Sequence, residues 1–160
     1  MKETDEPLSS AIRIYHNTTN AAGMGPGTSW CASFVNWCMN QAGYINTYSY
    51  PALAYGWKPN AWAEGEIHGI DRDPKGVPFL GAIVVFNFSH VAFVVGQTND
   101  GRIVALGGNQ GNYYMNITSV GSGAVLYYMK PRGYIVSSES EKLPVLNVAG
   151  GEMTYENTHN

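Results

Sequence analysis

The sequence has few charged residues, and its basic residues form no cluster. Charged side chains make up 13% of the 160 residues, and the formal net charge is −3. A surface without a run of Lys and Arg argues against electrostatic binding of nucleic acid. Apolar residues make up 44%, which argues against a disordered chain. The length and composition therefore predict one globular domain that does not bind nucleic acid.

Long apolar runs are also missing. No apolar run approaches the roughly 20 residues that a membrane helix needs, so we expect no contact with a membrane. Residues 1–6 are mostly polar and acidic, and no apolar segment of the kind found in secretory signals follows them. We therefore expect synthesis in the cytoplasm without a signal peptide. Action outside the producing cell would need another route.

Cysteine occurs only at Cys31 and Cys38. Both fall in one predicted helix, in which the rise per residue separates them by roughly 10 Å along the axis. That separation excludes a disulfide between them unless the helix unwinds. No set of His, Asp or Glu residues has metal-ligand spacing, and the glycines before Cys31 lack the lysine of a phosphate-binding loop. We expect neither a metal nor a cofactor.

Helical patterns come first along the chain. A short helix is predicted over residues 11–16. The apolar spacing after Cys31 predicts a second helix, with Thr28 or Ser29 as its N-cap. Gly43 is a suitable residue to end that helix.

A long loop is predicted over residues 44–78, which are rich in Tyr, Trp, Pro and Gly. It contains one short helical pattern over 61–64. Long loops inside compact domains are often functional.

A strand pattern begins after Gly81. The predicted strands cover residues 82–86, 90–96, 102–106, 115–118 and 124–129. The turn signal at 99–101 makes a hairpin of the second and third of these strands. Helices followed by an antiparallel meander predict an α+β fold. We predict one domain over 1–136 and a tail over 137–160 that wraps the domain or meets a partner.

Cys31 stands where a glycine-rich loop becomes a helix. Unpaired backbone N–H groups and the positive end of the helix dipole favour a thiolate at such a position. The alternative is a buried core cysteine, an interpretation that suits Cys38 in the middle of the helix better. We therefore interpret Cys31 as a candidate nucleophile.

His90 opens an apolar strand directly after a predicted turn. A ring held rigidly there suits a general base, although a structural histidine is the alternative. The paired strand ends in Gly107-Gly108-Asn109-Gln110, and the hairpin returns that end to the neighbourhood of His90. An amide there would fix the tautomer that leaves the other ring nitrogen free for the thiol, although the same composition is typical of a plain turn.

Aromatic side chains are the candidates for a substrate groove, although such residues more often fill a core. Trp57 and Trp62 lie in the long loop, and Trp30 precedes the candidate nucleophile. We predict substrate contacts from these three residues and from Gln110. The remaining histidines are predicted to be surface groups: His16, His68 and His159.

Three segments in this order resemble a bacterial cysteine peptidase and amidase superfamily. Residues 30–38, followed by 41–43, resemble the nucleophile helix of the NlpC/P60- and CHAP-like group. Residues 81–86 and 90–96 resemble its histidine hairpin, and residues 106–110 resemble its third-residue segment. The three motifs together are more specific than any of them alone.

This resemblance implies a papain-like α+β fold of the NlpC/P60 type, with N-terminal helices packed on an antiparallel sheet. It implies a catalytic domain over 1–136 that hydrolyses amide bonds in the stem peptides of peptidoglycan. It also implies Cys31 as nucleophile, His90 as base and Asn109 as the residue that orients the imidazole. Gln110 is the alternative for that last role.

A compact amidase with no wall-binding repeat resembles the effectors that type VI secretion systems inject into the periplasm of rival cells. That resemblance implies an antibacterial toxin that degrades the cell wall, and an immunity protein that blocks its active site. The alternatives are a phage-type endolysin and a non-catalytic wall-binding module with a dead site. Whether the γ-D-glutamyl–diaminopimelate or the D-alanyl–diaminopimelate bond is cut stays open.

Overall fold

The structure is a computed structural model that describes residues 1–44, 51–59, 70–111, 114–150 and 153–159. Its helices are α1 (Leu8–Asn17), α2 (Cys31–Gln41) and α3 (Tyr155–Thr158), with 3₁₀ turns η1 (Ala54–Trp57) and η2 (Ser122–Ala124). Its strands are β1 (Ile70–Arg72), β2 (Ile83–Phe86), β3 (His90–Gln97), β4 (Ile103–Gln110), β5 (Tyr114–Val120) and β6 (Val125–Pro131). The α+β class predicted from the sequence is confirmed.

The helix predicted to hold Cys31 is confirmed together with its end, but it begins one or two residues later than its predicted N-cap implies. Helix α2 begins at Cys31, and Gly43 follows its end with a φ of 86°, a left-handed conformation that glycine adopts without strain. The N-cap is Trp30, not Thr28 or Ser29, and no side-chain cap bond is present at it. Trp30 takes this position because its indole is fully buried in the core.

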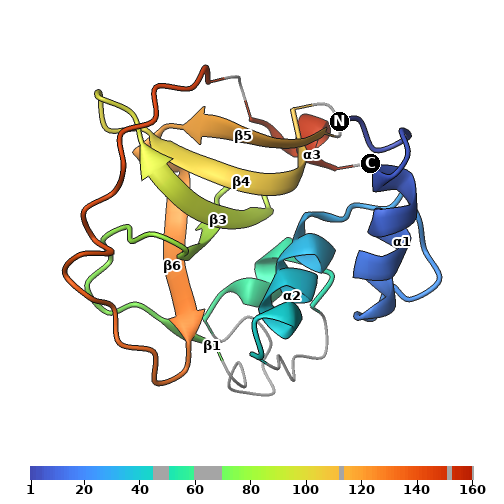
Figure 1. Cartoon of the computed structure of the whole chain (residues 1–160), viewed down its shortest axis with the longest axis horizontal. Helices are drawn as coiled ribbons and strands as arrows, with labels where there is room; N and C mark the ends of the chain where they lie inside the picture. Colours follow the sequence, from blue (N-terminus) through green and yellow to red (C-terminus); the bar gives the residue numbers. More distant parts are fainter. Residues whose placement is uncertain (45–50, 60–69, 112–113, 151–152, 160) are drawn as a thin grey trace.

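The strands form one six-stranded antiparallel sheet in the order β1-β6-β2-β3-β4-β5 (Figure 1). The meander predicted from the sequence is confirmed for β2 to β5. Strand β6 departs from it, because it returns to pair with β2 on the other side. The short β1 was not predicted, since three residues in a polar loop give no periodic signal.

Two apolar layers cover the two faces of the sheet. Helix α2 packs on one face, where Val35 and Met39 meet Ile83, Val85 and other buried residues. The opposite face is covered partly by the C-terminal chain, whose Leu143 is buried in the second cluster. Strand β2 is therefore buried at every position, as expected for a central strand with both faces covered.

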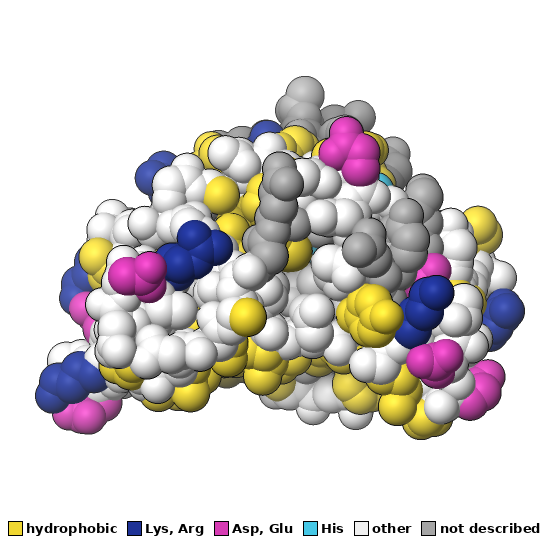
Figure 2. All heavy atoms as spheres, turned by 90° about the horizontal axis from the view of Figure 1, so that it is seen from above, with side chains coloured by type: hydrophobic (Ala, Val, Ile, Leu, Met, Phe, Trp, Pro, Cys, Tyr) yellow, Lys and Arg dark blue, Asp and Glu magenta, His cyan; other side chains and the backbone are white. Residues whose placement is uncertain are grey.

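The C-terminal chain runs along the sheet and bonds to two of its strands. Leu146 N–H donates to the Gln97 carbonyl at 2.8 Å, and Gly150 forms a parallel bridge with Ser119. The chain then reaches α3, which lies beside β4 close to both chain ends (Figure 1). On the face seen in Figure 2, charged side chains of both signs are scattered and do not gather into one patch. No helix in the described ranges is long and apolar enough to cross a membrane.

His16 was predicted to be a surface group, and that prediction is wrong. Its ring is fully buried, and its Nδ1 lies 2.8 Å from the Ser33 hydroxyl oxygen. The bond links α1 to α2. His16 has a structural place in the helical layer, and His68 lies outside the described residues.

Candidate active site

Cys31 is the first residue of α2 and is almost completely buried, with 2% of its surface exposed. Helix α2 packs against β3, and the backbone N–H of Val91 on β3 reaches the thiol. Val91 follows His90 directly in the chain. The fold therefore brings the Cys31 thiol to the start of the strand that begins with His90.

Burial dominates the acidity of this thiol. It raises the pKa of Cys31 to about 11, although the backbone N–H groups of Val91, Ala32 and Cys31 itself act to lower it. The sequence-based expectation that the helix start favours a thiolate therefore does not hold in this closed structure. The resting thiol is neutral near pH 7.

His90 is held rigidly at the first position of β3. It is fully buried, and it stacks on Phe86 and Phe88 at centroid distances of 6.1 and 5.8 Å. Burial lowers the pKa of His90 to about 4; the hydrogen bond that His90 donates to Gln110 opposes this shift, and the charge of His159 adds to it. The imidazole is therefore neutral near pH 7.

The side chain of Gln110 fixes the tautomer of this imidazole. Its Nε2 lies 3.0 Å from the Asn116 backbone carbonyl oxygen, and its Oε1 lies 3.0 Å from His90 Nε2. Because a backbone carbonyl only accepts, the amide nitrogen must face Asn116. The amide oxygen then faces the ring, and His90 Nε2 donates to it. His90 Nδ1 is left as the basic nitrogen, and it is buried without a hydrogen-bond partner in the described part of the chain.

A bulge in β4 and its two glycines make room for this arrangement. The β4–β5 register shifts between Gly107 and Gln110, so that β4 has one residue more than its partner strand there. A Cβ on Gly107 would lie 2.6 Å from Gln110 Oε1, and one on Gly108 would overlap the Trp30 ring. Glycine at both positions lets the amide reach His90 and lets the indole pack under β4.

Asn109 points to a different partner from the one that the sequence predicted. It takes a left-handed φ of 58°, which Asn tolerates better than most residues. Its Nδ2 donates to the Thr158 carbonyl at 2.6 Å, and its Oδ1 is buried without a hydrogen-bond partner in the described ranges. The His90 ring donates its hydrogen bond to Gln110 instead.

Residues 23–109 match the CHAP domain family, and the match covers more than half of the chain. The chain belongs to the CHAP domain family. CHAP domains are typically cysteine hydrolases of the amidase and peptidase type, which suggests activity on peptidoglycan. The antiparallel sheet with its few helices agrees with the papain-like fold of this group. No curated protein and no solved structure matches the chain.

Trp30 and Trp57 of this CHAP domain are buried in the core. Trp30 is fully buried and its indole N–H donates to Glu3 at 3.0 Å; Trp57 is 1% exposed and donates to the Pro51 carbonyl at 3.1 Å. Both indoles satisfy their one polar group inside the core, as buried tryptophans must. Their predicted contact with substrate stays a prediction. Trp62 lies outside the described residues.

Both cysteines of the CHAP domain are free, which confirms the prediction that they form no disulfide. Burial raises the pKa of the half-buried Cys38 to about 11. Among the described residues, no group of His, Cys, Asp and Glu side chains is arranged to hold a metal ion.

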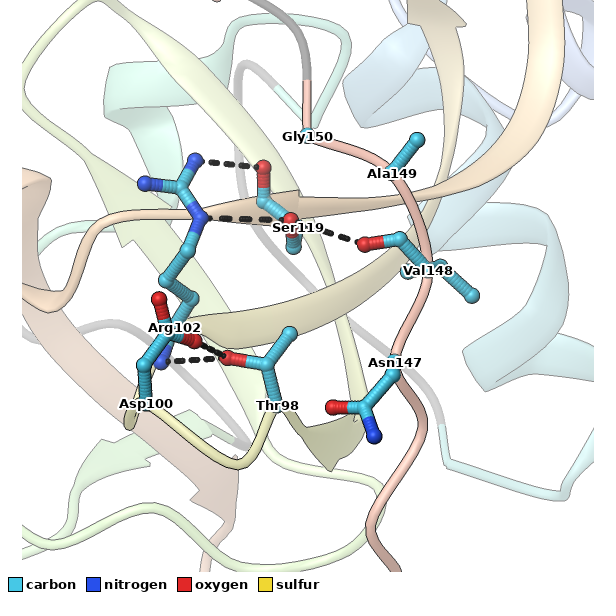
Figure 3. A pocket seen from close by; sticks show the side chains of 8 residues that line it. All are labelled: Thr98, Asp100, Arg102, Ser119, Asn147, Val148, Ala149 and Gly150. Carbon is cyan, nitrogen blue, oxygen red and sulfur yellow. Dashed lines mark hydrogen bonds between the residues drawn. The ribbon is translucent and has the colours of Figure 1, made fainter.

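An open pocket lies at the other end of the β3–β4 hairpin (Figure 3). Thr98, Arg102 and Ser119 line it together with residues 147–150. The guanidinium of Arg102 donates to the hydroxyl and carbonyl oxygens of Ser119 at 3.2 and 3.0 Å. These bonds tie Arg102 to strand β5. None of the candidate catalytic residues lines this pocket.

Proposed function

We propose that this CHAP domain is a cysteine amidase or endopeptidase that cleaves amide bonds in the stem peptides of peptidoglycan. In this proposal Cys31 is the nucleophile, His90 is the general base and Gln110 orients the imidazole. The single observation that supports it best is the amide of Gln110, held between His90 Nε2 and Asn116. It leaves His90 Nδ1 as a buried base on the strand that the thiol contacts.

The chemistry follows from this tautomer. His90 Nδ1 takes the proton of Cys31 Sγ as the sulfur attacks the carbonyl carbon of the substrate amide. The backbone N–H of Cys31, at the start of α2, donates to the oxyanion that forms. The imidazolium then gives its proton to the leaving amine, and a thioester remains on Cys31. Water loses a proton to Nδ1 and attacks the thioester, and the thiol regains that proton as the acid product leaves.

Gln110 is favoured over Asn109 as the orienting residue. The sequence offered both, with Asn109 first. The amide oxygen of Gln110 lies 3.0 Å from His90 Nε2 and accepts its hydrogen bond, whereas the amide of Asn109 donates to the Thr158 carbonyl. Asn109 remains beside the site as a candidate contact for the substrate, because its amide donates to a backbone carbonyl.

The biological setting is a further part of the proposal and rests on the resemblance described above. We propose an antibacterial effector that acts in the periplasm of a rival cell, with an immunity protein that blocks the active site. Targeting the chain to the periplasm of a Gram-negative host should lyse the cells, and the same chain with Cys31→Ala should not. Equal growth of cells that carry the wild-type chain and cells that carry Cys31→Ala would favour the wall-binding alternative. Lysis that co-expression of the neighbouring gene's product does not prevent would favour the endolysin alternative.

Purified sacculi test the enzymatic function directly. Mass spectrometry after incubation with the wild-type chain should find new stem-peptide fragments, and their masses identify the cleaved bond. Cys31→Ala should release none, and Cys38→Ala is the matched control that should retain activity. A folded wild-type chain that releases no fragment would overturn the peptidoglycan assignment and favour another acyl substrate or a binding role.

A further inference from the structure

Residues 1–3 lie along the outer edge of β5, where that strand begins (Figure 1). Lys2 forms an antiparallel bridge with Tyr114, the first residue of β5. Tyr114 is in turn the register partner of Gln110 on β4. The segment therefore joins the sheet in the same row as the side chain that bonds to His90.

Glu3 follows in this segment and is buried, with 7% of its surface exposed. Its Oε2 accepts a hydrogen bond from the indole Nε1–H of Trp30 at 3.0 Å. A carboxylate is seldom buried unless polar partners replace the water that it loses. The indole N–H is the one polar group of a tryptophan side chain, so its acceptor fixes which way the ring is turned.

The Trp30 indole lies between the two parts of the chain that carry the candidate reacting groups. Trp30 is the N-cap of α2, and the next residue is Cys31. Its six-membered ring packs against Gly108, where an added Cβ would lie 2.2 Å from ring carbon Cζ3. Gly108 stands in the β4 bulge that ends at Gln110. Because the contact is so close, a turn of this ring would shift the start of α2 relative to the bulge.

The remaining neighbours of the indole give it no fixed direction. Ile12 and Phe34 share its apolar cluster, and Tyr15 stacks on it at a centroid distance of 6.4 Å. Apolar burial is non-directional, whereas a hydrogen bond requires the donor to point at its acceptor. The bond to Glu3 therefore supplies the orientation that the apolar contacts do not.

We propose that Glu3 is a positioning residue of the candidate active site and that it acts through Trp30. Its carboxylate holds the indole against the β4 bulge, and the ring in turn sets the distance between the Cys31 thiol and the His90 imidazole. A misplacement of about 1 Å can cost on the order of 10²-fold in rate. This effect on the rate rests on the proposed function, whereas the placement of the imidazole can be tested without a substrate.

Nitrogen-15 NMR of the His90 ring is that test, because long-range spectra show which ring nitrogen carries the proton. In the wild-type chain we expect the proton on Nε2, where Gln110 accepts it. Glu3→Ala removes the acceptor of the indole N–H, so the bulge that aligns Gln110 loses its support. We expect the Nδ1–H tautomer to appear at a population on the order of 10% or more. Glu3→Gln keeps an oxygen that can accept the bond, and should give the wild-type spectrum.

Two further measurements show whether the indole bond is the cause. Exchange of the Trp30 indole N–H with solvent should rise about tenfold or more in Glu3→Ala. Lys2→Ala, at the exposed neighbouring position, should change neither the exchange nor the His90 spectrum. Glu3→Asp keeps the charge but shortens the side chain, and should change both in the same direction as Glu3→Ala by a smaller amount.

Three results would overturn the positioning role. One is unchanged indole exchange in folded Glu3→Ala or Glu3→Asp. The second is raised exchange with an unchanged His90 spectrum, which would leave Glu3 a structural residue only. The third is a change in Glu3→Gln or Lys2→Ala as large as that in Glu3→Ala.

Kinetics on a soluble stem peptide measures the consequence for the rate. Glu3→Ala should lower kcat by about tenfold or more and leave KM within about twofold, because alignment and not binding is lost. In Trp30→Phe, which has no indole N–H, Glu3→Ala should cost less than about twofold more. Losses that multiply would show that Glu3 does not act through Trp30. A His90 spectrum that responds to Glu3→Ala, in a wild-type chain that releases no fragment from sacculi, would keep the positioning role and overturn the hydrolase instead.

Discussion

The two ends of the β3–β4 hairpin differ in a way that matters for locating function. One end holds the buried side chains of His90 and Gln110, and a ring nitrogen there has no hydrogen-bond partner among the described residues. The other end holds Thr98 and Arg102 beside an open pocket (Figure 3), and the Arg102 guanidinium is bonded to Ser119. Polar groups that are already hydrogen-bonded, as at the open pocket, are poorly suited to take part in a reaction. A buried ring nitrogen without a hydrogen-bond partner among the described residues is better suited to act as a base. The comparison therefore favours the end that holds His90 and Gln110 as the candidate reactive end.

The largest effect should come from the nucleophile at the end that holds His90. Cys31→Ala should lower kcat by about 10⁴-fold or more, because the covalent step is lost. Release of stem-peptide fragments from sacculi measures it, with circular dichroism to show that the variant folds. Cys38→Ala should stay within about threefold of wild type. Activity that survives in Cys31→Ala and disappears in Cys38→Ala would reverse the assignment.

The two neighbouring amides at the end that holds His90 should differ from each other. Gln110→Ala should lower kcat by about 10²-fold or more, because the imidazole loses the acceptor that fixes its tautomer. Asn109→Ala should act mainly on KM and by about tenfold or less, because Asn109 contacts the C-terminal segment and not the ring. Steady-state kinetics on a soluble stem peptide separates the two effects. A larger loss of kcat in Asn109→Ala would return the orienting role to Asn109.

Acid should destabilise the end that holds His90. The pKa of His90 is lowered by burial to about 4 from its ordinary value of 6.5. The unfolded chain therefore binds a proton below pH 6.5 that the folded chain does not, and stability falls as the pH drops from 6.5 to 4. The expected loss from this residue is about 3 kcal/mol in the free energy of unfolding. Urea unfolding at pH 7.5 and pH 4 measures it.

A second variant isolates this effect from the other titrating groups. His90→Gln should make the pH dependence shallower over the same range, although His16, whose pKa is also lowered by burial, will still contribute. An unchanged slope in His90→Gln would show that the ring is hydrated in solution.

The smallest effect should come from the open end. Arg102→Ala should leave hydrolysis within about twofold of wild type, because the guanidinium is remote from His90 along the hairpin. It should lower the free energy of unfolding by about 1 kcal/mol through the lost bonds to Ser119. A strong loss of activity with intact stability would show that the open pocket takes part in function, and the contrast between the two ends would fail.

The elements that the sequence predicted well are those with a regular pattern. The start of α2 at Cys31 and the strands from β2 to β6 follow apolar periodicity, which local residue order determines. Strand β1 and the N-cap at Trp30 depend on contacts from distant segments. The burial of His16 has the same cause, because its ring is held by Ser33 across the helical layer.

The site was predictable in part for the same reason. Cys31 and His90 stand at the starts of regular elements, where the sequence places them clearly. That Asn109 and Gln110 bond to different partners was not predictable, because this depends on a bulge that only pairing with β5 creates. The contact of Thr158 with Asn109 spans 49 positions, and no local signal in the sequence indicates it.

The extra residue in β4 has a consequence for how such a domain can change over time. In a regular strand, neighbouring side chains alternate between faces, and one backbone register sets the positions of both. A change that shifted the register to suit one amide would therefore also move the other. Here Asn109 lies within the bulge and Gln110 at its end, and they bond to separate partners, the carbonyl of Thr158 and the ring of His90. Selection can therefore alter residue 109, and with it whatever chain docks there, while the alignment of the base at residue 110 is inherited unchanged.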